Sequence, residues 1–140
     1  MKPSTRDRDR LQGVHPALVL VVEGAFDRFP FAFQEAPSFR LFVIEGLRTM
    51  ERQREYLRTG ASRTLKSRHL TGHAVDLGIQ AEGAARWEFP LYRRLWIDCV
   101  EPVAKAADVA VEWGGVIFGP RFLDGPHFQL SPTAYPAKPA

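Results

Sequence analysis

The feature that most constrains the fold of this chain is a stripe of apolar residues spaced four apart in its second half. The stripe consists of Leu91, Leu95, Cys99, Val103 and Ala107. Residues at this spacing lie on one face of an α-helix, and a helix with one apolar face needs a partner surface that covers it. We therefore predict a long helix over residues 90–107. A chain of 140 residues has room for one domain of this kind and little more.

Two further segments have helical features. Pro16 can open a helix, because the first helical residue needs no N–H donor, and apolar residues then recur at helical spacing up to an expected break at Pro30. Thr49 is suited to cap another helix through about Arg58, which Gly60 would end.

Four short segments have strand features, because they are rich in aromatic and β-branched residues or alternate in polarity. They are residues 39–45, 74–79, 109–113 and 127–130. In the second segment Val75, Leu77 and Ile79 would share one face of the strand, with Asp76 on the other.

Helices interspersed with few, short strands predict an α+β fold, in which a small, mainly antiparallel sheet has helices packed against it. Residues 1–130 would form this single domain. Residues 131–140 contain three prolines and are expected to form a flexible tail. The chain has neither a heptad seam nor a second domain, which favours a monomer.

The formal charge of +3 and the isoelectric point of about 9.4 favour anionic partners in general. The basic residues are scattered along the sequence. Their densest run, Arg6, Arg8 and Arg10, alternates with Asp7 and Asp9, which indicates a solvated start to the chain. We therefore expect no nucleic-acid partner.

Cysteine content and hydropathy exclude several classes of site. Cys99 is the single cysteine, so an internal disulfide and a zinc–thiolate cluster are both excluded, and its apolar setting favours a buried structural thiol. Residues 1–10 lack the apolar core of a secretory signal, and the most apolar run, residues 17–22, is too short to cross a bilayer. We expect synthesis in the cytoplasm without stable membrane insertion, so a substrate outside the membrane would require release by another component.

Two clusters bring histidines close to carboxylates. His69 precedes Asp76 across a glycine-containing turn, and Asp124 precedes His127 across a Gly-Pro turn. Zinc sites that catalyse hydrolysis have three protein ligands from His, Asp or Glu together with a water molecule. The two clusters supply that set and leave Asp124 as a base for the water. From spacing alone the alternative stays open that these are loop histidines and a strand histidine capped by a carboxylate.

Residues 67–76 match the pattern S-x-H-x-x-G-x-A-x-D, which is the signature of the zinc D,D-peptidase superfamily. That group includes D-alanyl-D-alanine carboxypeptidases and dipeptidases and the L-alanyl-D-glutamate endopeptidases of phage endolysins. Residues 112–115 and 124–128 resemble the second half of these proteins, and residues 46–49, followed by Gln53, resemble their upstream arginine motif. One departure is Val116-Ile117-Phe118, where endolysin-like members often have Trp two residues after Gly-Gly.

The resemblance implies a Hedgehog/D,D-peptidase-like fold and a role for each matching residue. The ligands of Zn²⁺ would be His69, Asp76 and His127. Asp124 would be the catalytic carboxylate, and Arg48 would contact the scissile carbonyl and its developing oxyanion. Ser67 and Arg48 would bind substrate. His73 is not assigned as a ligand, because the position after the glycine varies in this family.

The resemblance therefore implies a zinc-dependent peptidoglycan peptidase, like a phage endolysin, that hydrolyses the L-alanyl-D-glutamate bond of stem peptides. Water activated by zinc would attack the amide, with Asp124 as general base. Such a lysin is made in the host cytoplasm and acts on the cell wall in the periplasm after release. Three alternatives stay open: a D-alanyl-D-alanine carboxypeptidase, a non-catalytic zinc-containing binding module, and a DNA-binding or scaffold protein whose closed structural zinc site has His73 as fourth ligand.

Overall fold

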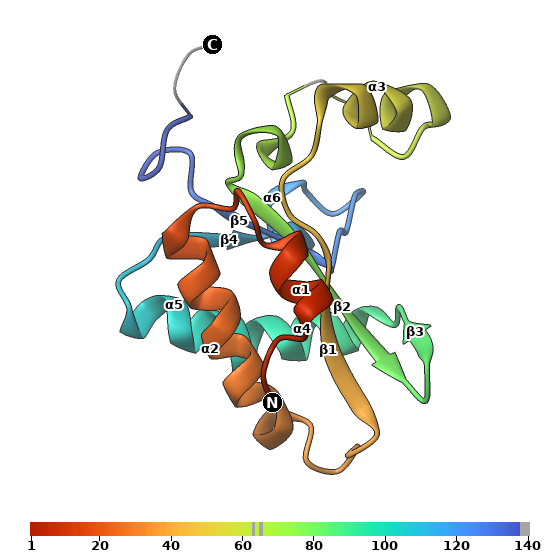
Figure 1. Ribbon diagram of the computed structural model, residues 1–140, viewed down its shortest axis with the longest axis vertical. Helices are drawn as coiled ribbons and strands as arrows, with labels where there is room; N and C mark the ends of the chain where they lie inside the picture. The colour runs from red at the N-terminus through yellow and green to blue at the C-terminus, as the bar shows by residue number, and fades with distance from the viewer. Residues whose placement is uncertain (63, 65, 138–140) are drawn as a thin grey trace.

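A computed structural model of the chain describes residues 1–62, 64 and 66–137. Its centre is a five-stranded sheet in which four strands have the order β1-β2-β5-β4 (Figure 1). The remaining strand, β3, pairs with the C-terminal end of β2. The strands are β1 (Phe39–Glu45), β2 (Ala74–Ala81), β3 (Ala84–Arg86), β4 (Val111–Trp113) and β5 (His127–Leu130). Each pair of neighbouring strands is antiparallel. The predicted α+β fold with a small antiparallel sheet is confirmed.

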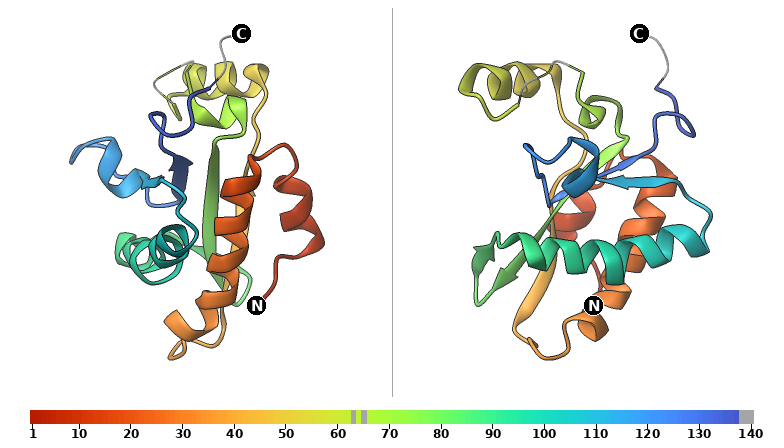
Figure 2. Two further views of the ribbon diagram at one scale, coloured as in Figure 1. Left: turned by 90° about the vertical axis from the view of Figure 1, so that its left-hand side faces the viewer. Right: turned by 180° about the vertical axis from the view of Figure 1, so that it is seen from behind.

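Helices surround the sheet and bury its apolar side chains. They are α1 (Thr5–Arg10), α2 (Pro16–Ala32), α3 (Met50–Thr59), η1 (Arg68–Thr71), α4 (Phe89–Arg94), η2 (Leu95–Val100), α5 (Glu101–Ala106) and α6 (Gly114–Ile117). Two views show α2 crossing the continuous helix formed by α4, η2 and α5 (Figure 2). The core between them includes Phe26 and Leu95, together with Val75, Leu77 and Ile79 on the predicted face of β2.

The predicted helix over residues 90–107 forms, but its middle segment, η2, is a π-helix. Pro102 lacks the N–H that would bond to the carbonyl of Asp98, and that carbonyl accepts from Arg28 Nε at 2.8 Å instead. Leu95 and Cys99 are fully buried as predicted, and Val103 beyond the π-helix packs against the core, while Ala107 follows the end of α5 and is exposed.

Cys99 is a buried thiol, as the sequence predicted. Burial raises its pKa to about 12, so the side chain is neutral and unreactive at physiological pH.

The prediction that Pro30 ends α2 is wrong, because the helix continues to Ala32. A proline inside a helix costs about 3 kcal/mol through its missing N–H and its ring. Burial of the aromatic residues on either side offsets this cost. Phe29 and Phe33 are 1% and 2% exposed, their rings stack at 4.5 Å between centroids, and Phe33 N donates to Phe29 O at 3.0 Å.

The three arginines of the predicted solvated chain start are exposed as expected, but residues 5–10 form helix α1, which buries Asp7. Ser4 Oγ accepts from Asp7 N at 3.1 Å and Ser4 N donates to Asp7 Oδ2 at 2.8 Å, which makes a capping box. Asp7 is buried, and its Oδ1 accepts from Val43 N on β1 at 2.8 Å, while Arg10 Nη1 donates to Val43 O at 2.8 Å. Helix α1 therefore covers the edge of the sheet at β1.

Three smaller differences concern strand ends. The strand β2 runs two residues further than predicted and turns through Glu82 and Gly83, which both have positive φ, into the unpredicted strand β3. The strand predicted over residues 109–113 begins at Val111. The short helix α6 follows it directly and was not predicted.

Residues 131–137 make specific contacts in the structure. Arg68 Nη2 donates to the carbonyls of Leu130 and Tyr135 at 3.0 and 2.7 Å, and the Tyr135 ring lies 5.2 Å from that of His15. Residues 138–140 lie outside the described part of the chain, and a flexible tail stays a prediction. Within the described ranges, no helix combines the length and the apolar content needed to cross a bilayer.

Candidate metal centre and cleft

The pairing of the sheet places acidic and histidine side chains in one row. Asp76 on β2 is paired with His127 on β5. On its other side Asp76 is paired with Glu45, just after an irregularity in β1. Because residues directly opposite each other in antiparallel strands point to the same face, these three side chains project together from one face of the sheet.

His69 reaches the same face from the turn before β2. Ser67 caps the 3₁₀ turn η1, with its Oγ accepting from His69 N at 3.2 Å, and Gly72 ends it at φ 75°. Only glycine fits at residue 72, because a Cβ there would collide with the carbonyl of Gly13 in addition to the strain of positive φ. The turn leaves His69 Nε2 3.1 Å from Asp76 Oδ1.

Hydrogen bonds outside the site fix which nitrogen of each histidine faces inward. His69 Nδ1 lies 2.8 Å from the carbonyl of Gly46, which can only accept, so Nδ1 carries the proton and Nε2 has a free lone pair. His127 Nε2 lies 2.8 Å from Gln129 Oε1, so Nε2 carries the proton and Nδ1 has the lone pair.

Glu112 fixes the orientation of the Gln129 amide. Gln129 Nε2 donates to Glu112 Oε1 at 3.1 Å, so its Oε1 is the atom that accepts from His127. Glu112 and Gln129 are paired residues on β4 and β5. Glu112 therefore supports the orientation of the His127 ring through Gln129.

Three electron-pair donors thus converge. His127 Nδ1 is 3.3 Å from Asp76 Oδ1, and ligand atoms of His69, Asp76 and His127 all lie within 4.8 Å of one another. Lone pairs facing one another repel unless a proton or a cation lies between them. Two oriented imidazoles and a carboxylate are ligands that suit a transition-metal ion, so the group could hold one.

The charge states of the group agree with this arrangement. Without an ion, a proton on the ring nitrogen that faces Asp76 can take its place. Burial alone would raise the pKa of Asp76, but hydrogen bonds from the protonated rings of His127 and His69 outweigh burial and hold that pKa well below its ordinary value. Burial opposes a charge on His127 in the same way, but the hydrogen bond to Asp76 outweighs it and raises the pKa of His127. The site therefore favours a positive charge next to an ionised carboxylate.

Asp124 is held beside this group by a tight turn. Its N donates to Gly114 O at 3.0 Å, and His127 N donates to Asp124 O at 3.2 Å. Gly114 has to be glycine, because a Cβ there would collide with the carbonyl of Asp124. Trp113, buried in the core, donates from Nε1 to Gly125 O at 2.8 Å and fixes the turn. Burial and then the charge of Asp76 raise the pKa of Asp124.

Arg48 lies near the second carboxylate oxygen of Asp76. Its Nη2 is 4.0 Å from Asp76 Oδ2, and its guanidinium carbon is 4.6 Å from the centroid of the Tyr56 ring. Nε donates to Glu45 Oε1 at 2.8 Å and Nη1 donates to the buried Gln53 Oε1 at 2.7 Å. These contacts aim the guanidinium at the metal group. The supporting roles of Glu45, Tyr56 and Gln129 were not predicted, because they depend on strand pairing and, for Tyr56, on the placement of helix α3.

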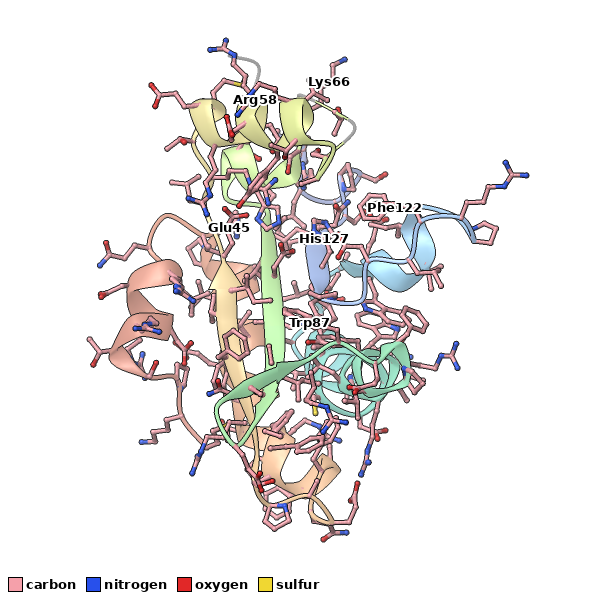
Figure 3. All side chains as sticks on the ribbon, turned by 90° about the vertical axis from the view of Figure 1, so that its right-hand side faces the viewer. Glu45, Arg58, Lys66, Trp87, Phe122 and His127 are labelled. Atoms are coloured by element: carbon pink, nitrogen blue, oxygen red, sulfur yellow. The ribbon has the colours of Figure 1, made fainter. Side chains whose placement is uncertain are left out.

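A cleft of about 800 Å³ opens over these residues. Arg48, Arg52, Lys66 and Arg68 line one side, and Phe118 and Phe122 line another. Figure 3 shows Lys66 at the end of the molecule that carries α3, and Phe122 on the side of α6. Residues 48–68 contain seven Lys and Arg against two Glu, so the prediction of scattered basic residues is corrected for this segment.

His73 lies apart from this group. Its Nδ1 is 2.7 Å from Thr71 Oγ1 and its ring is 5.6 Å from that of His15. Among the residues that the structure describes, the clustered metal-binding groups are His69, Asp76 and His127 without His73.

Comparison with known proteins decides the family. The profile of the phage L-alanyl-D-glutamate peptidase family matches residues 1–131. The chain belongs to this family. The predicted resemblance to D,D-peptidase-like proteins is thereby confirmed, and the His-Asp-His group is the candidate metal site of a phage L-alanyl-D-glutamate peptidase family member.

Two proteins similar to this chain illustrate the family. The L-alanyl-D-glutamate peptidase of Listeria phage A118 is 34% identical over 103 residues, which are 74% of this chain and 34% of the relative. The chain thus spans about a third of that relative's length. The crystal structure of Serratia marcescens L-Ala D-Glu endopeptidase ChiX matches with a TM-score of 0.79 and 41% identity, over 98% of this chain and 95% of that one.

Proposed function

We propose that the chain is a zinc-dependent peptidoglycan peptidase that hydrolyses the L-alanyl-D-glutamate bond of stem peptides. The observation that carries the proposal is the convergence of His69, Asp76 and His127, with both histidine lone pairs turned inward, in a cleft that Asp124 and Arg48 also line. The choice of the L-alanyl-D-glutamate bond follows from the names of the Listeria phage and Serratia relatives.

Zinc fits the ligand set better than magnesium or calcium, because two of the three ligands are imidazole nitrogens. With His69, Asp76 and His127 as its protein ligands, a bound zinc ion would keep a coordination position for water, as in catalytic zinc sites. When bound, zinc supplies a Lewis acid that lowers the pKa of water from 15.7 to about 7.

Asp124 is proposed as the general base. Its carboxylate lines the cleft beside the metal group, and burial raises its pKa. A raised pKa makes the carboxylate a better proton acceptor, so it can take a proton from the attacking water and pass that proton to the leaving amine of D-glutamate.

Arg48 is proposed to stabilise the negative charge that develops on the scissile carbonyl oxygen. Glu45 and Gln53 hold its guanidinium in place before substrate arrives, and such preorganised donors lower the barrier most. Ser67 lines the cleft 3.5 Å from Arg48 Nη1, which supports its proposed contact with substrate.

Each side chain of the proposed site comes from one chain, so we propose that a monomer is active on peptidoglycan at the cell wall. Neither nucleic acid nor a membrane is a proposed partner.

Digestion of purified peptidoglycan, with fragment masses read by mass spectrometry, tests this function. We expect new fragments that begin with D-glutamate, their loss when a chelator removes zinc, and their return when zinc is added back. Release of free D-alanine without such fragments would instead identify a D,D-carboxypeptidase. Intact peptidoglycan in the presence of zinc would contradict the proposal and favour a binding module.

A further inference from the structure

Helix α3 contributes little to the core and much to the cleft. Gln53 is its one buried side chain, and two views show the helix at one end of the molecule, away from α2 and α5 (Figures 1 and 2). Gln53 bonds to Arg48 Nη1 and to Ser62 Oγ, at 2.7 and 2.9 Å, rather than to apolar neighbours. The helix therefore serves to hold polar side chains at the cleft wall.

Arg52 is one of these side chains, and most of its hydrogen-bonding capacity is unused. Its Nε donates to Tyr56 Oη at 2.9 Å and lies 3.3 Å from Glu45 Oε2. Within the described part of the chain, Nη1 and Nη2 have no hydrogen-bond partner, which leaves four of the five N–H donors of the guanidinium free. The side chain lines the cleft and is 63% exposed.

This wall of the cleft also has unbalanced positive charge. Glu45 is the ion-pair partner of both Arg48, through Oε1, and Arg52, through Oε2. One carboxylate therefore serves two guanidinium groups, and Lys66 and Arg68 add further positive charge to the lining. A wall of this kind attracts a carboxylate, and a guanidinium with both terminal nitrogens free can bind one through two parallel hydrogen bonds.

The proposed substrate has such a group beside the scissile bond. Glutamate has two carboxyl groups, and the stem peptide continues through only one of them, so the other is free. We propose that Arg52 binds this free carboxylate of D-glutamate through Nη1 and Nη2 and makes the enzyme select the free acid over its carboxamide. This inference rests on the proposed function. Glu45 and Tyr56 hold Nε and leave the opposite edge of the guanidinium available to the substrate.

The test compares two stem peptides that differ only at the free carboxyl of D-glutamate, one as the acid and one as the carboxamide. The wild-type kcat/KM is expected to favour the acid by about 10- to 100-fold, as for a charge-assisted hydrogen-bonded pair. Arg52→Gln should reduce kcat/KM for the acid by a similar factor and leave that for the amide nearly unchanged. Arg52→Lys should keep part of the selectivity, because lysine retains the positive charge but cannot form two parallel hydrogen bonds with a carboxylate.

Arg54→Gln is the matched control, since Arg54 is exposed on the same helix and does not line the cleft. It should retain the wild-type ratio of acid to amide. The inference is overturned if Arg52→Gln also retains that ratio, or if Lys66→Gln alone abolishes it. Cleavage of both peptides by wild type with no selectivity overturns the inference and leaves the proposed function intact. Cleavage of neither at the L-alanyl-D-glutamate bond overturns both.

Discussion

At the residue scale, the site is set by which atoms face the ion-binding position. Gly46 and Gln129 each accept an N–H from a histidine, and so turn His69 Nε2 and His127 Nδ1 toward Asp76. Loss of such a hydrogen bond to a ligand histidine typically lowers metal affinity by about 10- to 100-fold. The distinction between binding the metal and performing the chemistry can be tested one residue at a time.

Asp124→Ala should abolish hydrolysis while zinc stays bound, because Asp124 lies outside the clustered ligands. Loss of a general base lowers kcat by about 10²- to 10⁴-fold. Kinetics on a stem peptide and zinc content by elemental analysis measure the two effects, with the exposed Asp27→Asn as control. A variant that cleaves like wild type would remove Asp124 from the mechanism.

Gln129→Leu should weaken zinc binding by about 10- to 100-fold. Leucine cannot accept the His127 Nε2–H, so that imidazole loses the partner that fixes its orientation. Competition with a chromogenic chelator measures the Kd. An unchanged Kd would show that the Glu112–Gln129–His127 chain of hydrogen bonds has no effect on the metal.

At the element scale, the helices and strands were predicted best where their own side chains determine them. The alternation at Val75, Leu77 and Ile79 predicts β2 and its buried face without reference to any partner. Helix α1 was missed because its stability comes from Asp7, whose carboxylate accepts from a strand more than thirty residues away. Its local signal, Ser4 followed three residues later by an acid, is a capping box that the sequence does contain.

Asp7→Ala should therefore destabilise the protein by about 1–3 kcal/mol, because it leaves the Val43 N–H buried without an acceptor and removes part of the cap. Urea unfolding, followed by circular dichroism, measures the free energy of unfolding. Asp9→Ala on the exposed side of the same helix is the control. Equal stabilities of the two variants would show that the contact between α1 and β1 does not stabilise the fold.

At the scale of the whole molecule, the order of motifs predicted the site residues, and the sheet explains why they meet. The pairing of Asp76 with His127 brings together residues separated by 51 positions. The roles of Glu45 and Arg52 could not be assigned from the sequence. They depend on the end of β1 and helix α3 both lying at the cleft, which only the folded structure shows. Strand pairing is a tertiary property that no local pattern in the sequence specifies.

Zinc should stabilise the whole fold, since its ligands come from η1, β2 and β5. Binding at a free concentration of 100 times Kd contributes about 2.7 kcal/mol. Thermal unfolding with and without zinc should show a higher Tm for the zinc form, and His127→Ala should remove the difference. An identical Tm in both conditions for wild type would indicate that no ion joins these elements.

The most direct test of the metal centre is anomalous diffraction at the zinc edge from crystals grown with zinc. We predict one strong peak with His69 Nε2, His127 Nδ1 and an Asp76 carboxylate oxygen at about 2.0–2.2 Å from it, and a fourth position open to solvent. A peak ligated by His73, or a His127 ring turned away from the other two ligands, would contradict a catalytic zinc centre at His69, Asp76 and His127.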